Sequence, residues 1–147
     1  VRPSPHLGTL EVRICDGVSN LRELGALVAL THCLIVDLDR RLEADQPLPT
    51  MPPWHVQENK WRAARYGLDA VIILDADSNE RLVTEDLDDV LNRLEPIAKS
   101  LKCSDELAAV ADIPRRGGSY QRQRRVAEEH DGDLRSVVDA LVAELDI

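Results

Sequence analysis

RPSPHLGTLEVR, residues 2–13, is the densest polar run of this sequence and carries its clearest structural signal. From Thr9 onward polar and apolar residues alternate, and this period of two predicts a β-strand over 9–15. Glu11 and Arg13 then share one face of the strand, about 7 Å apart along it. A strand this isolated is not stable by itself, so we expect its sheet partners to lie mostly outside this chain.

Helical spacing replaces the alternation further along the chain. Ser19 or Asn20 is suited to cap a long apolar-rich helix over 20–44, which we expect to be buried on most of its sides. Four prolines follow closely and cannot sit inside a helix, so a connecting loop is expected over 46–57. A short helix is predicted over 58–66.

The second half of the chain predicts one small hairpin and then helices only. Two apolar runs flank a turn-forming segment, which favours a hairpin over 70–83. Regular apolar spacing of three and four predicts a helical region over 84–147. The predicted fold class is therefore α+β and mostly helical, within a single domain.

Composition narrows the possible functions. The chain has 147 residues, 44% of them hydrophobic, and a formal charge of −9, which argues against a general nucleic-acid binder. The longest apolar stretch, 24–38, is interrupted by polar residues and is too short to span a membrane. Cys15, Cys33 and Cys103 are far apart and form no zinc-binding pattern, which favours a reduced, cytoplasmic protein whose cysteines act as small hydrophobic residues.

The Glu11–Arg13 spacing has two interpretations. A carboxylate and a guanidinium on one strand face can hold a divalent cation and a phosphoryl oxygen, respectively. The same spacing also occurs as a simple ion pair on a solvated sheet face. The spacing alone leaves both open.

The longer motifs resemble a known family. Residues 2–13, followed by Asp16 and a long apolar helix, resemble a signature of bacterial carboxylate–amine ligases, which include one type of glutamate–cysteine ligase. ENKWRAARYGLD, residues 58–69, resembles the second C-terminal signature of that family, and LVTED, residues 82–86, fits as well. The resemblance extends over nearly the whole chain, in the family's order, and corresponds to the C-terminal portion of such a ligase.

The resemblance implies a glutamine-synthetase-like fold, in which helices pack behind a curved antiparallel sheet that carries the active site. It implies a reaction in which ATP activates the γ-carboxylate of glutamate as an acyl phosphate. The amine of cysteine, or another small amine, then forms the amide, a step in making glutathione-like thiols. By the same resemblance, Glu11 binds Mg²⁺ and Arg13 the transferred phosphoryl group. The other metal ligands would come from the missing N-terminal half, so the isolated chain is expected to be inactive.

Other polar residues are weaker candidates for the site. His6 could act in catalysis as a metal ligand or a donor to substrate, or be a structural turn residue. Arg2 could bind substrate or ATP. Asn59, Arg62 and Arg65 step by three along the short helix, so we expect them to share a side and to contact ATP phosphates or a substrate carboxylate. The alternative for these three is a solvated helix face paired with nearby acids.

A non-enzymatic function is the second hypothesis. Five arginines lie around Gly117 and Gly118, and a helical interaction module could use this basic cluster to bind an acidic partner. A severed ligase would instead expose apolar surface near Glu11 and self-associate, so a homo-oligomer is possible. The five are Arg115, Arg116, Arg122, Arg124 and Arg125.

Overall fold

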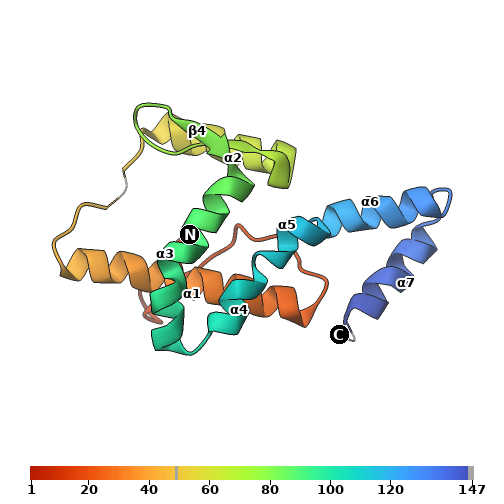
Figure 1. Ribbon diagram of the computed structural model, residues 1–147, viewed down its shortest axis with the longest axis horizontal. Coiled ribbons are helices and arrows are strands. Elements are labelled where there is room, and N and C mark those ends of the chain that lie inside the picture. The colour runs from red at the N-terminus through yellow and green to blue at the C-terminus, as the bar shows by residue number, and fades with distance from the viewer. Residues whose placement is uncertain (49, 146–147) are drawn as a thin grey trace.

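The computed structural model describes residues 1–48 and 50–145, arranged as shown in Figure 1. These residues are mostly helical and form two small antiparallel sheets of two strands each, which confirms the predicted α+β class. The parts of the predicted loop and helical region that fall on residues 49, 146 and 147 lie outside the described residues. In chain order the elements are β1 (Arg2–Ser4), β2 (Thr9–Glu11), α1 (Leu21–Glu43), α2 (Pro53–Tyr66), the 3-10 turn η1 (Gly67–Asp69), β3 (Val71–Ile73), β4 (Glu80–Leu82), α3 (Val83–Leu101), α4 (Ser104–Ala109), α5 (Asp112–Arg116), α6 (Ser119–Glu129) and α7 (Leu134–Leu145).

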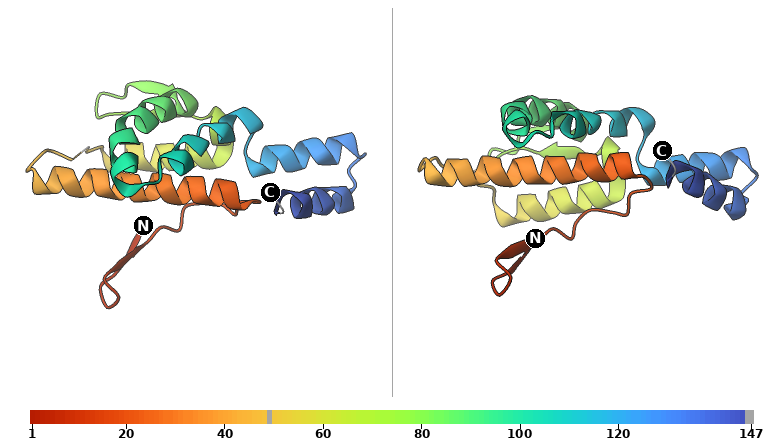
Figure 2. Two further views of the ribbon diagram at one scale, coloured as in Figure 1. Left: turned by 60° about the horizontal axis from the view of Figure 1, so that its bottom comes forward. Right: turned by 90° about the horizontal axis from the view of Figure 1, so that it is seen from below.

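The N-terminal strand is shorter than its alternating pattern suggests. It ends at Glu11 instead of residue 15, and it pairs with β1 of this same chain, whereas its partners were expected to lie mostly outside the chain. In the register of the pair, Arg2 lies opposite Glu11 and Ser4 opposite Thr9. Figure 2 shows this hairpin standing away from the helices, and all of β2 is exposed.

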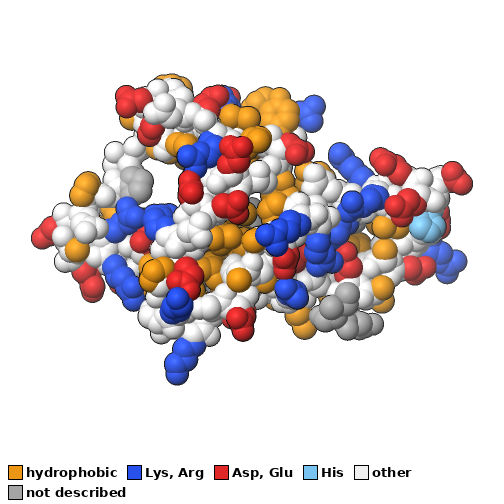
Figure 3. Space-filling view, in the orientation of Figure 1, with side chains coloured by type: hydrophobic (Ala, Val, Ile, Leu, Met, Phe, Trp, Pro, Cys, Tyr) orange, Lys and Arg blue, Asp and Glu red, His pale blue; other side chains and the backbone are white. Residues whose placement is uncertain are grey.

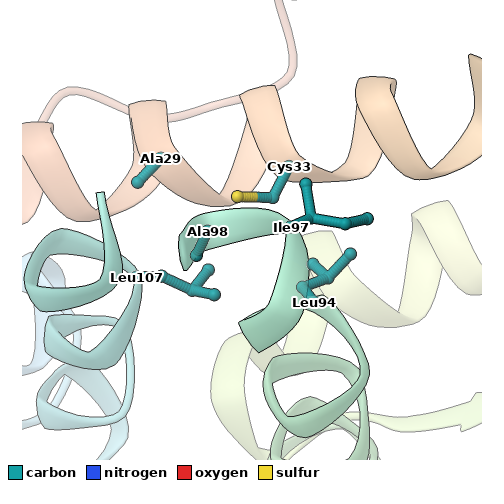
Figure 4. Close-up of a cluster of buried hydrophobic side chains, with 6 residues drawn as sticks. All are labelled: Ala29, Cys33, Leu94, Ile97, Ala98 and Leu107. Carbon is teal, nitrogen blue, oxygen red and sulfur yellow. The ribbon is translucent and has the colours of Figure 1, made fainter. Parts of the chain in front are cut away.

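α1 begins where the sequence places it. The Asn20 side chain caps the helix by accepting a hydrogen bond of 2.8 Å from the backbone N–H of Glu23. α3 and α4 pack across one side of α1, and the hydrophobic core lies between these three helices (Figure 4). Small side chains at the crossing allow the close approach. The core residues are Ala29, Cys33, Leu94, Ile97, Ala98 and Leu107.

The prediction that α1 is buried on most sides is wrong for this chain. Because α3 and α4 cover one side only, large apolar side chains remain exposed on the rest of the helix. Within the described residues, no helix combines the length and the apolar character that crossing a bilayer requires. The exposed apolar residues of α1 are Leu21, Leu24, Val28, Ile35, Leu38 and Leu42.

Proline positions account for two further differences from the sequence-based boundaries. α2 starts at Pro53, five residues before the predicted 58, and the described part of the loop ends at Pro52. Proline is tolerated in the first turn because the N–H it lacks has no partner there. The predicted helical region over 84–147 is interrupted after Ala109, so that α4 and α5 are separate helices. The ring of Pro114 conflicts with the carbonyl of Val110 four residues earlier, which explains the break.

The three cysteines have different environments. Cys33 is completely buried in the core, with its Sγ 3.9 Å from that of Cys103. Burial, together with the contact with Cys103, raises the pKa of the Cys33 thiol to about 11. Cys15 is exposed. The expectation of cysteines as small hydrophobic residues therefore holds for Cys33 and not for Cys15.

α6 and α7 form an antiparallel pair beyond the N-terminal end of α1 (Figure 2), and a buried arginine joins the three helices. The Arg122 side chain is only 10% exposed and donates hydrogen bonds to Ser19 Oγ at 2.9 Å, Glu23 Oε2 at 3.1 Å and Glu144 Oε1 at 2.9 Å. Ser19 also donates to Glu144. Burial would raise the pKa of Glu144, but the hydrogen bonds from Arg122 and Ser19 outweigh it and hold the pKa below its usual range.

Replacing Leu94 by Ala should destabilise the chain by about 2–5 kcal/mol, because Leu94 is fully buried and its loss leaves a cavity between the three core helices. The matched control is Leu42→Ala in α1, where the side chain is 58% exposed, and there the loss should stay below about 1 kcal/mol. Urea unfolding followed by circular dichroism measures both. Equal losses in the two variants would contradict the assigned core.

Glu144→Gln should reduce the dependence of stability on pH. A carboxyl group whose pKa is lowered by folding contributes stability above its unfolded pKa, and this contribution is lost as the pH falls through the folded value. When the pH is lowered below about 4.3, the free energy of unfolding of the wild-type chain should therefore decrease. In the variant this decrease should be less steep. Urea unfolding over a pH series tests this, with the exposed Glu128→Gln as control. A slope unchanged by Glu144→Gln would contradict the assigned network.

Candidate functional site

A cleft of about 1060 Å³ opens between three segments that are far apart in the sequence. They are the segment that follows β2, the second half of α2 and the first half of α6. The chain thus brings part of its N-terminal polar run against two helices. From these segments the cleft is lined by Arg13, Ile14, Asp16, Lys60, Ala63, Ala64, Arg65, Gly67, Tyr120 and Arg124, and Val1 lines it as well.

The contact between Gly67 and Tyr120 fixes one side of the cleft. Gly67 ends α2 with a φ of +58°, and a Cβ built there would lie 2.5 Å from the Tyr120 hydroxyl oxygen. Glycine is therefore required both for the backbone conformation and for the space that the tyrosine ring occupies. This contact places the start of α6 against the end of α2.

The cleft is strongly cationic. Arg13, Lys60, Arg65 and Arg124 line it, and among the described residues Asp16 is the one acidic side chain in the lining. Within the described residues, no carboxylate lies within 4.0 Å of the charged nitrogens of Lys60, Arg65 or Arg124. Cations that converge without acidic partners can bind an anion.

Glu11 and Arg13 lie close together, as their spacing predicts. Arg13 Nε is 3.4 Å from Glu11 Oε1, and Arg2 Nε approaches Glu11 Oε2 at 3.8 Å from the paired strand. All three side chains are at least half exposed. This geometry is that of an ion pair on a solvated hairpin, which is one of the two interpretations that the sequence left open. Arg13 also reaches the cleft, whereas Arg2 and Glu11 do not line it.

The residues of this chain do not by themselves fit a magnesium site. Mg²⁺ takes nearly octahedral oxygen coordination. Among residues 1–48 and 50–145, no three His, Cys, Asp or Glu side chains converge in a way that could hold a metal ion. Glu11 offers a single carboxylate, already paired with two arginines. His6 lies exposed in the turn between β1 and β2 and does not line the cleft.

The three predicted residues of α2 do not act together. Asn59 accepts a hydrogen bond of 2.8 Å from the Ile73 N–H and donates one of 2.7 Å to the Ile73 carbonyl, which fastens β3 to α2. Arg62 pairs with Glu58 at 2.9 Å and Glu80 at 2.7 Å, as the alternative of a paired helix face predicted. Residues three apart are rotated by about 60° around a helix, so two such steps separate residue 59 from residue 65 by about 120°.

Arg65 alone among these three lines the cleft, and its guanidinium lies over the Tyr66 ring at 5.7 Å from the centroid. Lys60 and Tyr120 were not singled out by the sequence, and Arg124 was named only as a member of the basic cluster around Gly117. A signal for Lys60 exists, because the small residues Ala63, Ala64 and Gly67 follow it at intervals of three, four and seven. That spacing places the lysine on a helix face that a neighbour can approach closely. The sequence offers no comparable signal for Tyr120.

The basic cluster around Gly117 is mostly used within the chain. Figure 3 shows Lys and Arg side chains gathered over α5 and α6. Arg122 is buried in its acidic network, Arg116 lies 3.5 Å from Glu23, and Arg115 lies 3.4 Å from Asp112. These ion pairs leave fewer charges for the acidic partner of the interaction-module hypothesis. Their acidic partners, Asp112 and Glu23, belong to α5 and α1.

Comparison with known proteins identifies the family. Residues 1–140 match the family model described as glutamate–cysteine ligase family 2. Relatives from Mycolicibacterium paratuberculosis and Mycobacterium avium, both with the provisional name glutamate–cysteine ligase 2, are 88% identical over the entire chain. One from Mycobacterium ulcerans with the same provisional name is 86% identical, also over the entire chain.

The chain spans 38–39% of the length of these relatives. No solved structure matches it. The family model covers nearly the whole chain, including the N-terminal polar run, α2 and the first part of α6 that together form the cleft. The chain belongs to glutamate–cysteine ligase family 2.

Proposed function

We propose that the full-length protein containing this chain is an ATP-dependent ligase that joins the γ-carboxylate of glutamate to the amine of cysteine. The observation that supports this most directly is that Arg13, which pairs with Glu11, lines one cationic cleft together with Lys60, Arg65 and Arg124. Family membership and the names of the relatives point to the same reaction class. We further propose that the chain completes a glutamine-synthetase-like fold.

The reaction has two steps. A γ-carboxylate oxygen of glutamate attacks the terminal phosphorus of ATP, forming an acyl phosphate and releasing ADP. The amine of cysteine then attacks the acyl carbon, loses a proton and displaces phosphate, which leaves an amide. Both steps depend on holding and neutralising phosphoryl oxygens, and a fixed guanidinium does this well.

Within this scheme Arg13 holds the phosphoryl group during transfer. Glu11 orients Arg13 through their ion pair, and it would supply one carboxylate to a magnesium site completed by the rest of the full-length protein. Because the chain lacks the other ligands, it should not catalyse the reaction alone. Arg62 and Asn59 support the architecture of α2 instead of contacting substrate.

Activity of the full-length protein should depend on both residues of the pair. We expect ADP release to require glutamate together with one amine from a panel that includes cysteine. Arg13→Gln should lower kcat by about 10²-fold, as the loss of one donor to a reacting oxygen does in other enzymes. Glu11→Gln should also lower it strongly. A coupled assay of ADP release measures these rates.

The control for this experiment is Glu129→Gln, an exposed acid of α6 outside the cleft, which should retain wild-type turnover. Unfolding curves of all variants establish that the proteins are equally stable. The proposed function would be wrong if no amine stimulated ADP release. The site assignment would be wrong if Glu11→Gln were as active as wild type.

A further inference from the structure

We infer that Lys60 and Arg124, with Arg65, form the binding site for the linked phosphates of a nucleoside triphosphate in the cleft between α2 and α6. This inference rests on the proposed function, since it names residues that would hold its nucleotide. Neither Lys60 nor Arg124 belongs to the polar run that motivated the assignment of Glu11 and Arg13.

The first argument is the distribution of charge. The chain has 27 acidic and 18 basic residues, so most of its cations can find an acidic partner. Many of its arginines do so, including Arg62, Arg81 and Arg93, each within 3.0 Å of a carboxylate. Lys60, Arg65 and Arg124 instead converge on one cleft without such partners among the described residues. Like charges gathered together repel, and a bound polyanion would remove that repulsion.

The second argument is preorganisation. The Arg124 guanidinium lies over the Tyr120 ring at 5.6 Å from its centroid, and the Arg65 guanidinium lies over Tyr66 at 5.7 Å. A cation–π contact of this kind favours one placement of the guanidinium without occupying its N–H donors with a carboxylate. Tyr120 is itself held against Gly67. The arginines are thus oriented without a carboxylate that would compete with an incoming phosphate.

The third argument is the size and position of the cleft. Its volume of about 1060 Å³ lies at the upper end of the range of about 300–1,000 Å³ that is usual for small-molecule sites, so a ligand as large as a nucleotide has room there. Arg13 lines the same cleft. A chain of phosphates held by Lys60, Arg65 and Arg124 could therefore extend its terminal phosphoryl group to the residue proposed to act in transfer.

The test is nucleotide binding to the full-length protein, measured by calorimetry in the absence of amino-acid substrates. The probes are a non-hydrolysable ATP analogue, tripolyphosphate and AMP. Lys60→Gln and Arg124→Gln should each weaken binding of the analogue and of tripolyphosphate by about tenfold or more, because each removes charge-assisted hydrogen bonds. The affinity for AMP, which lacks the linked phosphates, should decrease much less. Lys60→Arg should restore most of the affinity.

Matched controls are Lys99→Gln and Arg135→Gln, which remove a lysine and an arginine from helices that do not line the cleft. Their affinity for the analogue should remain within about twofold of wild type. Thermal unfolding of each variant shows whether a loss of binding reflects a loss of folding. A Lys60→Gln protein that is folded and binds the analogue as wild type would overturn the inference.

Failure of the inference and failure of the proposed function give different results. If turnover with glutamate and an amine persists and the cleft variants leave nucleotide binding unchanged, the nucleotide site lies elsewhere and the ligase function stands. If the variants weaken tripolyphosphate binding but no amine stimulates turnover, the phosphate site stands and the ligase proposal is wrong. If glutamate binding is weakened and nucleotide binding is not, the cleft binds a carboxylate and the inference is overturned.

Discussion

The buried ion network of Arg122 is the constraint on which the arrangement of the C-terminal helices depends. It joins α6 to the start of α1 through Ser19 and Glu23, and to α7 through Glu144. A buried ion pair contributes little net stability, but removing one partner leaves an uncompensated charge that costs about 3–5 kcal/mol. The network therefore acts mainly to specify where α6 lies.

This placement determines the composition of the cleft. Tyr120 and Arg124 are each two residues from Arg122 along α6, so they project from the helix on sides that the network fixes. With α6 held in place, Tyr120 lies against Gly67, and the Arg124 guanidinium lies over the Tyr120 ring at the cleft wall. A substitution that breaks the Arg122 network would thus change the cleft by changing the orientation of α6. The position of the cleft residues of α6 therefore depends on Arg122, which does not itself line the cleft.

Local signals in the sequence located most of the helices, because capping and apolar spacing act within one element. Asn20 caps α1, and the spacing of apolar residues after residue 83 identifies α3. The errors arose where the outcome depends on a neighbour. The strand pairs with β1 over Thr9–Glu11 alone, and apolar sides of α1 are exposed because, among the described residues, α3 and α4 cover one side of it. The spacing of apolar residues along a helix or strand does not show how much of its surface is covered by neighbouring elements.

The candidate site shows the same division. The pairing of Glu11 with Arg13 follows from a spacing of two residues, and the sequence predicted it. Asn59 and Arg65 lie on different sides of α2 because two steps of three residues rotate the side chain by about 120° around the helix. The prediction that they share one side did not take this rotation into account. Tyr120 could not have been identified, since its importance comes from Gly67, more than fifty residues away in the chain. Contacts of this kind require the tertiary structure.

The unequal environments of the three thiols have a practical consequence. Cys33 is buried and its raised pKa keeps it protonated, so alkylating reagents should leave it unmodified in the folded chain, while Cys15 is accessible. Cys15 stands between Ile14 and Asp16, both of which line the cationic cleft. The chain therefore carries a native attachment point for a fluorophore or spin label at the rim of its cleft, where the signal of the label would respond to whatever enters.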